Sequence, residues 1–352
     1  MIKKIFTVFI INIFLLSGAV CVSAGDDGVK RLTIGEAASL AVERSSELKN
    51  LDENAYLNEL NRTQLENQKR ESTTETQFIN AMISLFQNEL RQAMFGENKA
   101  LQRLSIEFLI TKYFAAVISA ERDLFLYDIS LELSEKNLKI AETRHNLGML
   151  SKNAFETQKH NHEKEIANRG AKTIAIENAY RALNGMTGQD LDARYELVLD
   201  APYEPLGDYD IDLYIQESAA VNTAIKNKEN DLRLAEYRLN ITGDNVSKED
   251  LEINLRQARR ALSDAIENFG EKLISCHKDI KNIEKQFALN QRDYEEMQIQ
   301  LVIKETQFGL GKLTQTDVDN HKYQMLQLEI KILNQANDHY IKKIQFLNPD
   351  LL

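Results

Sequence analysis

The histidines are the residues of this sequence whose chemistry could build a reactive site. His160 and His162 are two residues apart, and four more are scattered along the chain, at His145, His277, His321 and His339. On a helix, residues two apart point to different sides, so His160 and His162 cannot converge on one ion. The scattered histidines have no carboxylate or cysteine at ligand spacing. We therefore expect no metal site, no cofactor and no catalytic centre, and we predict that the protein is not an enzyme.

The composition is typical of long helices. The chain of 352 residues has three prolines and no tryptophan, and it is rich in good helix formers. It carries 43 Lys plus Arg against 54 Asp plus Glu, a net charge of −11. No basic block concentrates the positive charge, which argues against nucleic acid as a partner and against an anionic-lipid-binding surface. Association with a membrane by other means stays open.

The N-terminus predicts export through a signal peptide over residues 1–24. Lys3 and Lys4 precede an apolar stretch, and Val22-Ser23-Ala24 is a small-residue cleavage site. An uncleaved anchor is the alternative, because the apolar stretch approaches the ~20 residues that span a bilayer. After cleavage Cys276 is the single cysteine, so we expect no disulfide and a small buried thiol.

Apolar residues recur at coiled-coil spacing over residues 247–308. The steps alternate between four and three residues, which predicts one long helix with an apolar stripe, or seam, facing a partner helix. Its members are Leu262, Ile266, Phe269, Leu273, Cys276, Ile280, Ile283, Phe287, Asn290, Tyr294, Met297, Leu301, Lys304 and Phe308. Asn290 and Lys304 interrupt the seam, where they either set the register of the pairing or face a lumen. Shorter seams are predicted over 101–129 and 323–347.

The chain repeats one unit twice. Residues 142–151 align with residues 305–314, and residues 47–50 align with residues 224–227. We predict a first helical repeat over 25–199, a proline-containing linker over 200–208 and a second helical repeat over 209–352. Turns are expected at 95–99, 147–148, 241–245 and 310–311. The fold class is therefore all-α, with two tandem long coiled-coil helical hairpin repeats and little or no β structure.

The glycine turns have a defined conformation in this prediction. Gly148 and Gly311 each end a long helix, and we expect both to adopt a left-handed backbone for which glycine has no Cβ clash. Leu150 and Leu313 follow two residues later. They are either exposed on the turn or folded back onto their own hairpin, and the sequence does not decide between these two arrangements.

Several segments resemble the TolC-like outer-membrane efflux family. Leu32-Thr33-Ile34-Gly35-Glu36-Ala37-Ala38-Ser39-Leu40-Ala41, followed by Glu47-Leu48-Lys49, is similar to the opening of these proteins, although Ser45-Ser46 stands where Asn-Pro is usual. The Leu-Gly-x-Leu-Ser/Thr turns at 147–151 and 310–314 resemble the turns that close each repeat of the family. The resemblance covers nearly all of the mature chain.

The resemblance implies a homotrimer whose helices form a tapered hollow cylinder, the α-barrel, in the cell envelope. At the glycine turns a periplasmic-type adaptor (a membrane fusion protein) would dock and link the tube to a membrane transporter. The adaptor-docking residues implied are Gly148, Leu150, Ser151, Gly311, Leu313 and Thr314. The position of the family's closing Arg–Asp bridge holds Leu313 and Ala154 here, so we expect that bridge to be absent.

The resemblance also implies an acidic ring at the pore mouth, formed by Asp317 with Asp319 beside it. Three copies of Asp317 around a narrow mouth would favour cations. The alternative is a structural role at a helix start, in which Thr314 caps the helix and Asp317 is the third residue of the first turn.

The sequence departs from the family where its outer-membrane barrel strands should interrupt each repeat. Residues 78–95 carry apolar residues at helical spacing, and residues 240–250 are too short for two spanning strands of about 9–11 residues. The protein is therefore expected either to end in soluble space or to belong to a cell with one membrane, on its extracytoplasmic face. The leading hypothesis is an efflux conduit component, and the alternative is an exported coiled-coil scaffold without channel activity. The sequence does not identify the substrate, the adaptor or the pump.

Overall fold

The computed structural model describes residues 31–199, 203–241 and 247–352. The signal peptide predicted over 1–24 lies outside the described residues. So do residues 200–202 of the predicted linker and most of the turn predicted at 241–245. Within the described part of the chain, no helix combines the length and the apolar character needed to cross a membrane.

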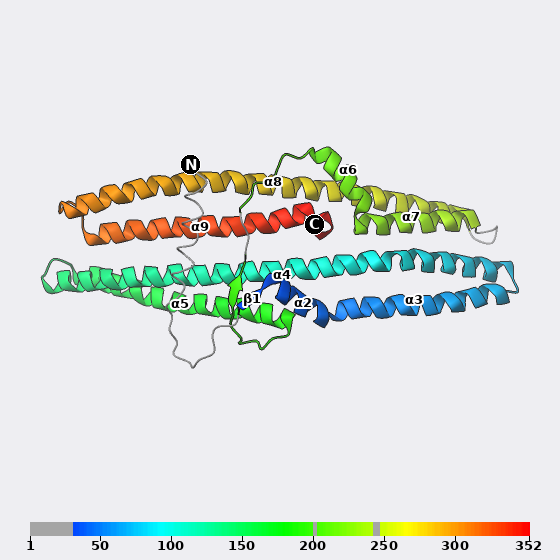
Figure 1. The fold of residues 1–352 in the computed structure, drawn as a ribbon, viewed down its shortest axis with the longest axis horizontal. Coiled ribbons are helices and arrows are strands. Elements are labelled where there is room, and N and C mark those ends of the chain that lie inside the picture. The colour runs from blue at the N-terminus through cyan, green and yellow to red at the C-terminus, as the bar shows by residue number, and fades with distance from the viewer. Residues whose placement is uncertain (1–30, 200–202, 242–246) are drawn as a thin grey trace.

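Long helices lying side by side make up nearly all of the described structure, which confirms the all-α prediction (Figure 1). The helices are Ile34–Arg44 (α2), Ser46–Glu71 (α3), Glu75–Asn146 (α4), Lys152–Thr187 (α5), Ile211–Val221 (α6), Thr223–Ile241 (α7), Lys248–Gly309 (α8) and Gln315–Leu347 (α9), with a short 3-10 turn at Pro349–Leu351 (η1). Strands β1 (Arg31–Thr33) and β2 (Glu196–Val198) form one parallel pair in the described residues.

The turn predicted at 95–99 is wrong, because α4 continues through these residues as a single helix. Gly96 lies within α4, and a glycine inside a helix costs only about 1 kcal/mol relative to alanine. The chain reverses instead at 72–74. There Thr74 caps α4 in a capping box with Gln77, which satisfies amide groups at the helix start.

The two repeats begin with the same local structure. Ser45 ends α2 and begins α3, and its hydroxyl accepts a hydrogen bond from the amide of Leu48 at 3.2 Å. Asn222 separates α6 from α7, and its side chain accepts a hydrogen bond from the amide of Ile225 at 3.0 Å. Leu48 and Ile225 are both buried. The residues that the sequence aligns at these positions therefore make equivalent caps.

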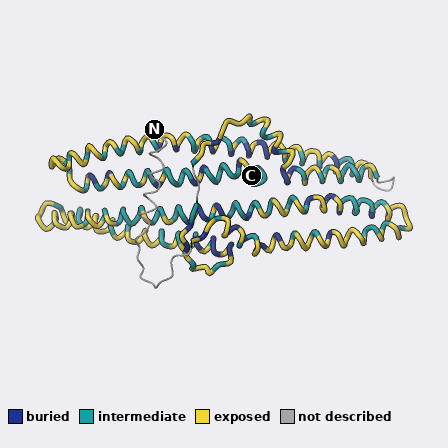
Figure 2. The backbone as a smooth tube through the Cα atoms, viewed as in Figure 1, coloured by how far each residue is buried: buried dark blue, intermediate teal, exposed yellow. Residues whose placement is uncertain are grey.

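Buried residues gather near the middle of the long helices, whereas both ends are more exposed (Figure 2). The first core joins α2, α4 and α5 around Ile110, Phe114 and Leu183. The second core joins α6 and α8 to the chain end around Leu273 and Phe346. Each large apolar side chain that is fully buried contributes about 1.5–3 kcal/mol.

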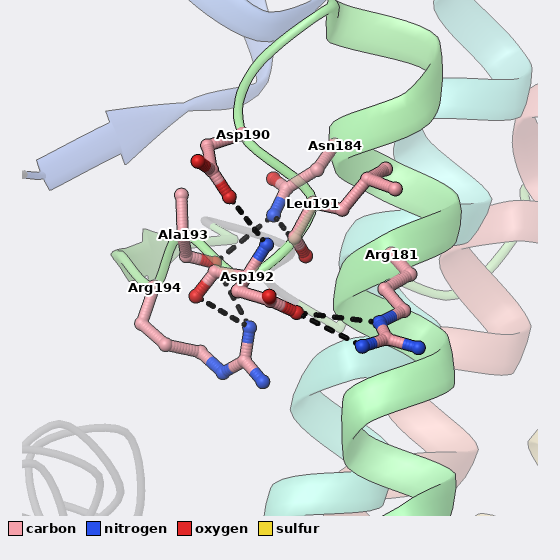
Figure 3. Close-up of polar contacts among 7 residues, drawn as sticks. All are labelled: Arg181, Asn184, Asp190, Leu191, Asp192, Ala193 and Arg194. Atoms are coloured by element: carbon pink, nitrogen blue, oxygen red, sulfur yellow. Dashed lines mark hydrogen bonds and ion pairs between the residues drawn. The ribbon is translucent and has the colours of Figure 1, made fainter.

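A loop after α5 closes the first core and directs the chain into β2 (Figure 3). Gly188 ends α5 with φ of 73°, a left-handed conformation that suits glycine. The amide of Asn184 then donates to the carbonyls of Leu191 and Ala193 at 3.2 and 3.0 Å, and Arg181 pairs with Asp192 at 3.1 Å. These bonds hold the loop in one path.

The seam predicted on α8 is buried against α9 in its middle portion. Phe269, Leu273, Cys276, Ile280 and Phe287 are all buried, and the Cys276 thiol contacts a carbonyl of α9, as expected for a small core residue. The side chain of Asn290, also buried, bonds to Gln335 at 2.6 Å and to Lys331 at 3.2 Å. Asn290 thus pairs α8 with α9 and does not face a lumen. Such a bond is satisfied in one register only, because a shifted helix would leave the amide unpaired.

Helix α4 also connects the two repeats. One side of α4 faces α5, where Arg169 pairs with Asp128 and Lys172 pairs with Asp123. Another side faces the second repeat, through bonds and ring contacts to α7 and α9. These contacts are Phe86 with Tyr237, Glu97 with Lys226, Arg122 with Asn334 and Lys136 with Asp319.

Candidate functional site

The two glycine turns lie at the same end of the molecule (Figure 1). One turn joins α4 to α5, and the other joins α8 to α9. Lys136 near the end of α4 contacts Asp319 near the start of α9 at 3.5 Å, so the two turns are neighbours. We call residues 145–155 and 308–319 the helix tips.

Both turns have the same backbone geometry. Gly148 and Gly311 each have φ of 72°, which confirms the predicted left-handed conformation. The next residue donates its amide to the carbonyl five positions earlier, Met149 to Arg144 and Lys312 to Gln307, each at 2.8 Å. Together with the amide bonds of the glycines themselves, this is the Schellman arrangement, which satisfies the last carbonyls of a helix.

The helices that leave the turns are capped by Ser151 and by Thr314, of which the sequence analysis offered Thr314 as a cap. The Ser151 hydroxyl accepts a hydrogen bond from the amide of Ala154 at 3.2 Å, and the Thr314 hydroxyl accepts one from the amide of Asp317 at 3.3 Å. The carboxylate of Asp317 in turn accepts bonds from the hydroxyl and amide of Thr314, at 2.7 and 2.9 Å. These bonds hold the pKa of Asp317 below its ordinary value. Asp317 therefore has the structural role that the sequence offered as an alternative.

Asp319 is held between the two repeats. Its carboxylate lies 3.5 Å from the Lys136 ammonium group on α4, and its other oxygen accepts a bond from Gln315 at 2.8 Å. Where the family has an Arg–Asp bridge, this chain has Leu313 and Ala154. The Lys136–Asp319 pair joins the tips at a different position.

The leucines predicted at the turns are only partly exposed. Leu150 and Leu313 are both half-buried, which agrees with leucines that fold back onto their own hairpins. The most exposed apolar residues of the tips are others: Leu147 at 69%, Met149 at 70% and Leu310 at 67%. The sequence analysis missed these three.

The histidines have no role as a metal site in the described residues, where no group of three or more potential ligands converges. His160 is exposed, and His162 bonds to Ser134 at 3.1 Å. His145 instead supports the first tip. Its ring bonds to the carbonyl of Leu150 at 2.9 Å and stacks on Phe155.

A groove of about 430 Å³ lies between α2, α4 and Ile344 of α9. Its lining is mostly apolar, and the charged residues in it, Arg103 and Glu107, pair with each other at 3.4 Å. The groove offers no arrangement of nucleophile, acid and base.

No known family profile matches the sequence, and no curated protein matches it. Solved structures match it closely in shape. The outer membrane protein VceC of Vibrio cholerae superposes with a TM-score of 0.67 at 10% identity, over 90% of this chain and 96% of that chain. The chain has the fold of outer-membrane channels.

Other channels match in the same way. The CmeC outer membrane channel of Campylobacter jejuni superposes with a TM-score of 0.59 at 11% identity, over 95% of this chain and 90% of that chain. The open state of the Neisseria gonorrhoeae MtrE outer membrane channel superposes with a TM-score of 0.53 at 11% identity, over 94% of this chain and 95% of that chain. The TolC-like fold predicted from the sequence is thus confirmed as a fold.

Replacing Gly311 by alanine tests the geometry of the tips. We expect Gly311→Ala to lower the free energy of unfolding by about 1–2 kcal/mol, since an alanine at this positive φ brings its Cβ against the following carbonyl. Gly309→Ala is the matched control. Gly309 is helical, and nothing lies within 4 Å of the position that an alanine methyl group would occupy, so this change should be neutral or stabilise by up to about 1 kcal/mol. Urea unfolding monitored by circular dichroism measures both, and equal effects would contradict the assignment.

Proposed function

We propose that the mature chain assembles into a homotrimeric helical tube of the cell envelope, which conducts substrates delivered by a membrane transporter through an adaptor. The observation that supports this most is the placement of exposed apolar residues. Ile299 on α8, Leu60 on α3 and Ile174 on α5 are exposed at positions whose counterparts in the other repeat contact the neighbouring repeat or are buried.

Ile299 on α8 is the clearest case. It stands twelve residues before Gly311, as Lys136 stands twelve residues before Gly148. Lys136 contacts α9 within the chain, whereas Ile299 is 65% exposed. Val302 and Ile303, at 64% and 52%, extend the same exposed stripe of α8. An apolar stripe on the outside of one helix is typical of a surface that packs against another protein.

Two further positions agree. Leu60 on α3 stands ten residues after Asn50, as Tyr237 on α7 stands ten residues after Asn227. Tyr237 stacks on Phe86 of the first repeat with ring centroids 4.3 Å apart, whereas Leu60 is 45% exposed.

Ile174 on α5 stands 26 residues after Gly148, as Asn337 on α9 stands 26 residues after Gly311. Asn337 is buried at 8% exposure, whereas Ile174 is 57% exposed.

A second copy of the chain would cover these residues. If α8 of one copy lies on α5 of the next as α4 lies on α9 within a chain, every repeat contacts a repeat on both sides. Such a contact is head-to-tail, and a ring of copies closes it without leaving an exposed edge. Three copies is the number that the resemblance implies.

The helix tips are the proposed docking surface for the adaptor. The most exposed apolar side chains there are Leu147, Met149 and Leu310, and the glycine turns and caps hold them in place. We place the acidic ring of the pore mouth at the same end. Asp317 is exposed and would contribute to it while it caps α9, and Asp319 would lie beside it in contact with Lys136.

Charging the α8 stripe tests the assembly. We expect Ile299→Glu with Ile303→Glu to weaken association at least 100-fold, because burying an unpaired carboxylate costs several kcal/mol. The fold of the single chain should be unchanged, since both side chains are exposed. Mass measured by light scattering after gel filtration, over a range of concentrations, gives the result.

Gln300→Glu with Gln307→Glu is the charge-matched control. These residues lie seven apart on the flank of α8, beside the stripe and not within it, and the two substitutions add the same charge. If both double variants keep the assembly of the natural chain, the stripe is not the interface. If the natural chain is a monomer at all concentrations, the conduit proposal is wrong and the scaffold hypothesis takes its place.

A second pair of variants tests docking at the tips. Leu147→Asp with Leu310→Asp should abolish recovery of the adaptor with the tagged protein from solubilised cell membranes, while the melting temperature stays within about 1 °C. Leu150→Asp with Leu313→Asp should lower the melting temperature, because these leucines are half-buried. Adaptor recovery that survives the first pair of substitutions would refute docking through the exposed tip residues.

A further inference from the structure

The linker between the repeats is fastened to the second repeat over residues 203–206. Leu206 is buried at 4% exposure in the second core. The ring of Tyr203 stacks on Phe287 of α8, with centroids 3.7 Å apart and planes at 11°. This short segment therefore packs tightly on the α8–α9 hairpin.

One turn of α8 holds both backbone polar groups of Leu206. The amide of Leu206 donates to Oε1 of Glu284, and the Lys281 ammonium group donates to the carbonyl of Leu206 at 2.7 Å. Lys281 also donates to Oε2 of Glu284 at 3.1 Å. Burial alone would raise the pKa of Glu284. These bonds and one from His339 nevertheless hold that pKa below its ordinary value.

A buried histidine completes the attachment. His339 of α9 is 1% exposed, and its Nε2 lies 3.2 Å from the same Oε1 of Glu284 that accepts the Leu206 amide. A carboxylate oxygen only accepts, so this nitrogen carries the hydrogen. The Tyr203 ring lies 4.9 Å from the His339 ring and covers it on the linker side.

The charged groups around His339 act on it in both directions: Glu284 favours a second proton, whereas Lys343 and Lys281 oppose it. Glu284 and Lys281 face it from α8, and Lys343 faces it from its own helix. The linker contributes the Tyr203 ring and Glu204, whose carbonyl and carboxylate lie 3.1 and 3.6 Å from the Lys343 ammonium group. The two ammonium groups thus balance two carboxylates, and both oxygens of Glu284 already accept hydrogen bonds. The pKa of His339 is lowered from its ordinary value, and burial is the largest cause.

We propose that residues 203–206 form a strap that mild acid releases, with the buried His339–Glu284 pair as its lock. With the strap closed, His339 is neutral and donates to Glu284. When the strap lifts, water reaches the imidazole and its pKa returns to about 6.5, the ordinary value of histidine. The free energy that favours the closed strap is therefore fully present above about pH 6.5 and falls as pH drops below it.

This device is independent of the proposed conduit, since it operates within one chain. It would make the connection between the repeats sensitive to the acidity of the compartment. Glu284 stays charged over the same range, because its pKa is held below the ordinary value, so the histidine alone provides the response.

Hydrogen exchange at the Leu206 amide tests the proposal on the mature chain. Corrected for the intrinsic pH dependence of exchange, its opening constant should rise between pH 6.5 and pH 5, by up to about tenfold per pH unit for one proton. The His339→Gln variant keeps a donor near Glu284 but does not titrate. Its opening constant should not change between pH 6.5 and pH 5. His160→Gln, at an exposed histidine, is the matched control and should respond like the natural chain.

Exchange at the imidazole C2 hydrogen of His339, followed by mass spectrometry from pH 4 to 9, gives a reading that needs no variant. It should report a pKa below about 6.5, the ordinary value of histidine. An acid response that persists in His339→Gln would overturn the proposal, as would a Leu206 amide that does not respond to pH. If His339→Gln does not fold, a His339 pKa at or above about 6.5 overturns it.

Discussion

The structure depends on one constraint, which is that helices this long carry more apolar surface than one partner helix can cover. Helix α4 covers part of this surface within the chain, since one side packs on α5 and another on α7 and α9. Helix α8 packs on α9 through its seam but leaves Ile299, Val302 and Ile303 in water. In the proposed assembly, a second copy of the chain covers this stripe.

Buried polar bonds determine how the helices pair along this length. Asn290 fixes α8 against α9, and at the other end Asn58 and Asn88 exchange side-chain and backbone bonds between α3 and α4. Continuous apolar seams alone would tolerate a shift by one heptad, whereas these amides would be left unpaired by it. The strap over Glu284 and His339 adds a further fixed point near mid-length, where the core is densest.

Much of the fold could be predicted from the sequence, because seams, glycine turns and repeats are local signals. The α8 seam, the left-handed Gly148 and Gly311 and the near absence of strands follow from spacing and residue type. The false turn at 95–99 came from giving one glycine too much weight. A helix anchored by tertiary packing tolerates the roughly 1 kcal/mol that Gly96 costs. The capping pattern from Thr74 to Gln77 was the better signal.

The site was less predictable than the fold. Gly148, Ser151, Gly311 and Thr314 shape the tips as their types indicate. Which apolar residues point outward depends on how each turn folds back, and the sequence does not give that direction. The strap was not visible at all, since Leu206, Glu284 and His339 are far apart in the sequence and meet only in the folded chain.

The central claim concerns the contact that the two repeats make within one chain. Copies of the chain should make the same contact with one another. Glu156 corresponds to Asp319 by its distance from the tip glycine, so Glu156 of one copy should meet Ile299 of the next as Asp319 meets Lys136. The direct measurement is thiol cross-linking of Glu156→Cys with Ile299→Cys, in a Cys276→Ala background, by a short bifunctional reagent. Lys136→Cys with Asp319→Cys should link within one chain and verifies the reach of the reagent. The account predicts a ladder of monomer, dimer and trimer on denaturing gels, ending at the trimer. No product between chains, or a ladder that passes the trimer, would contradict it.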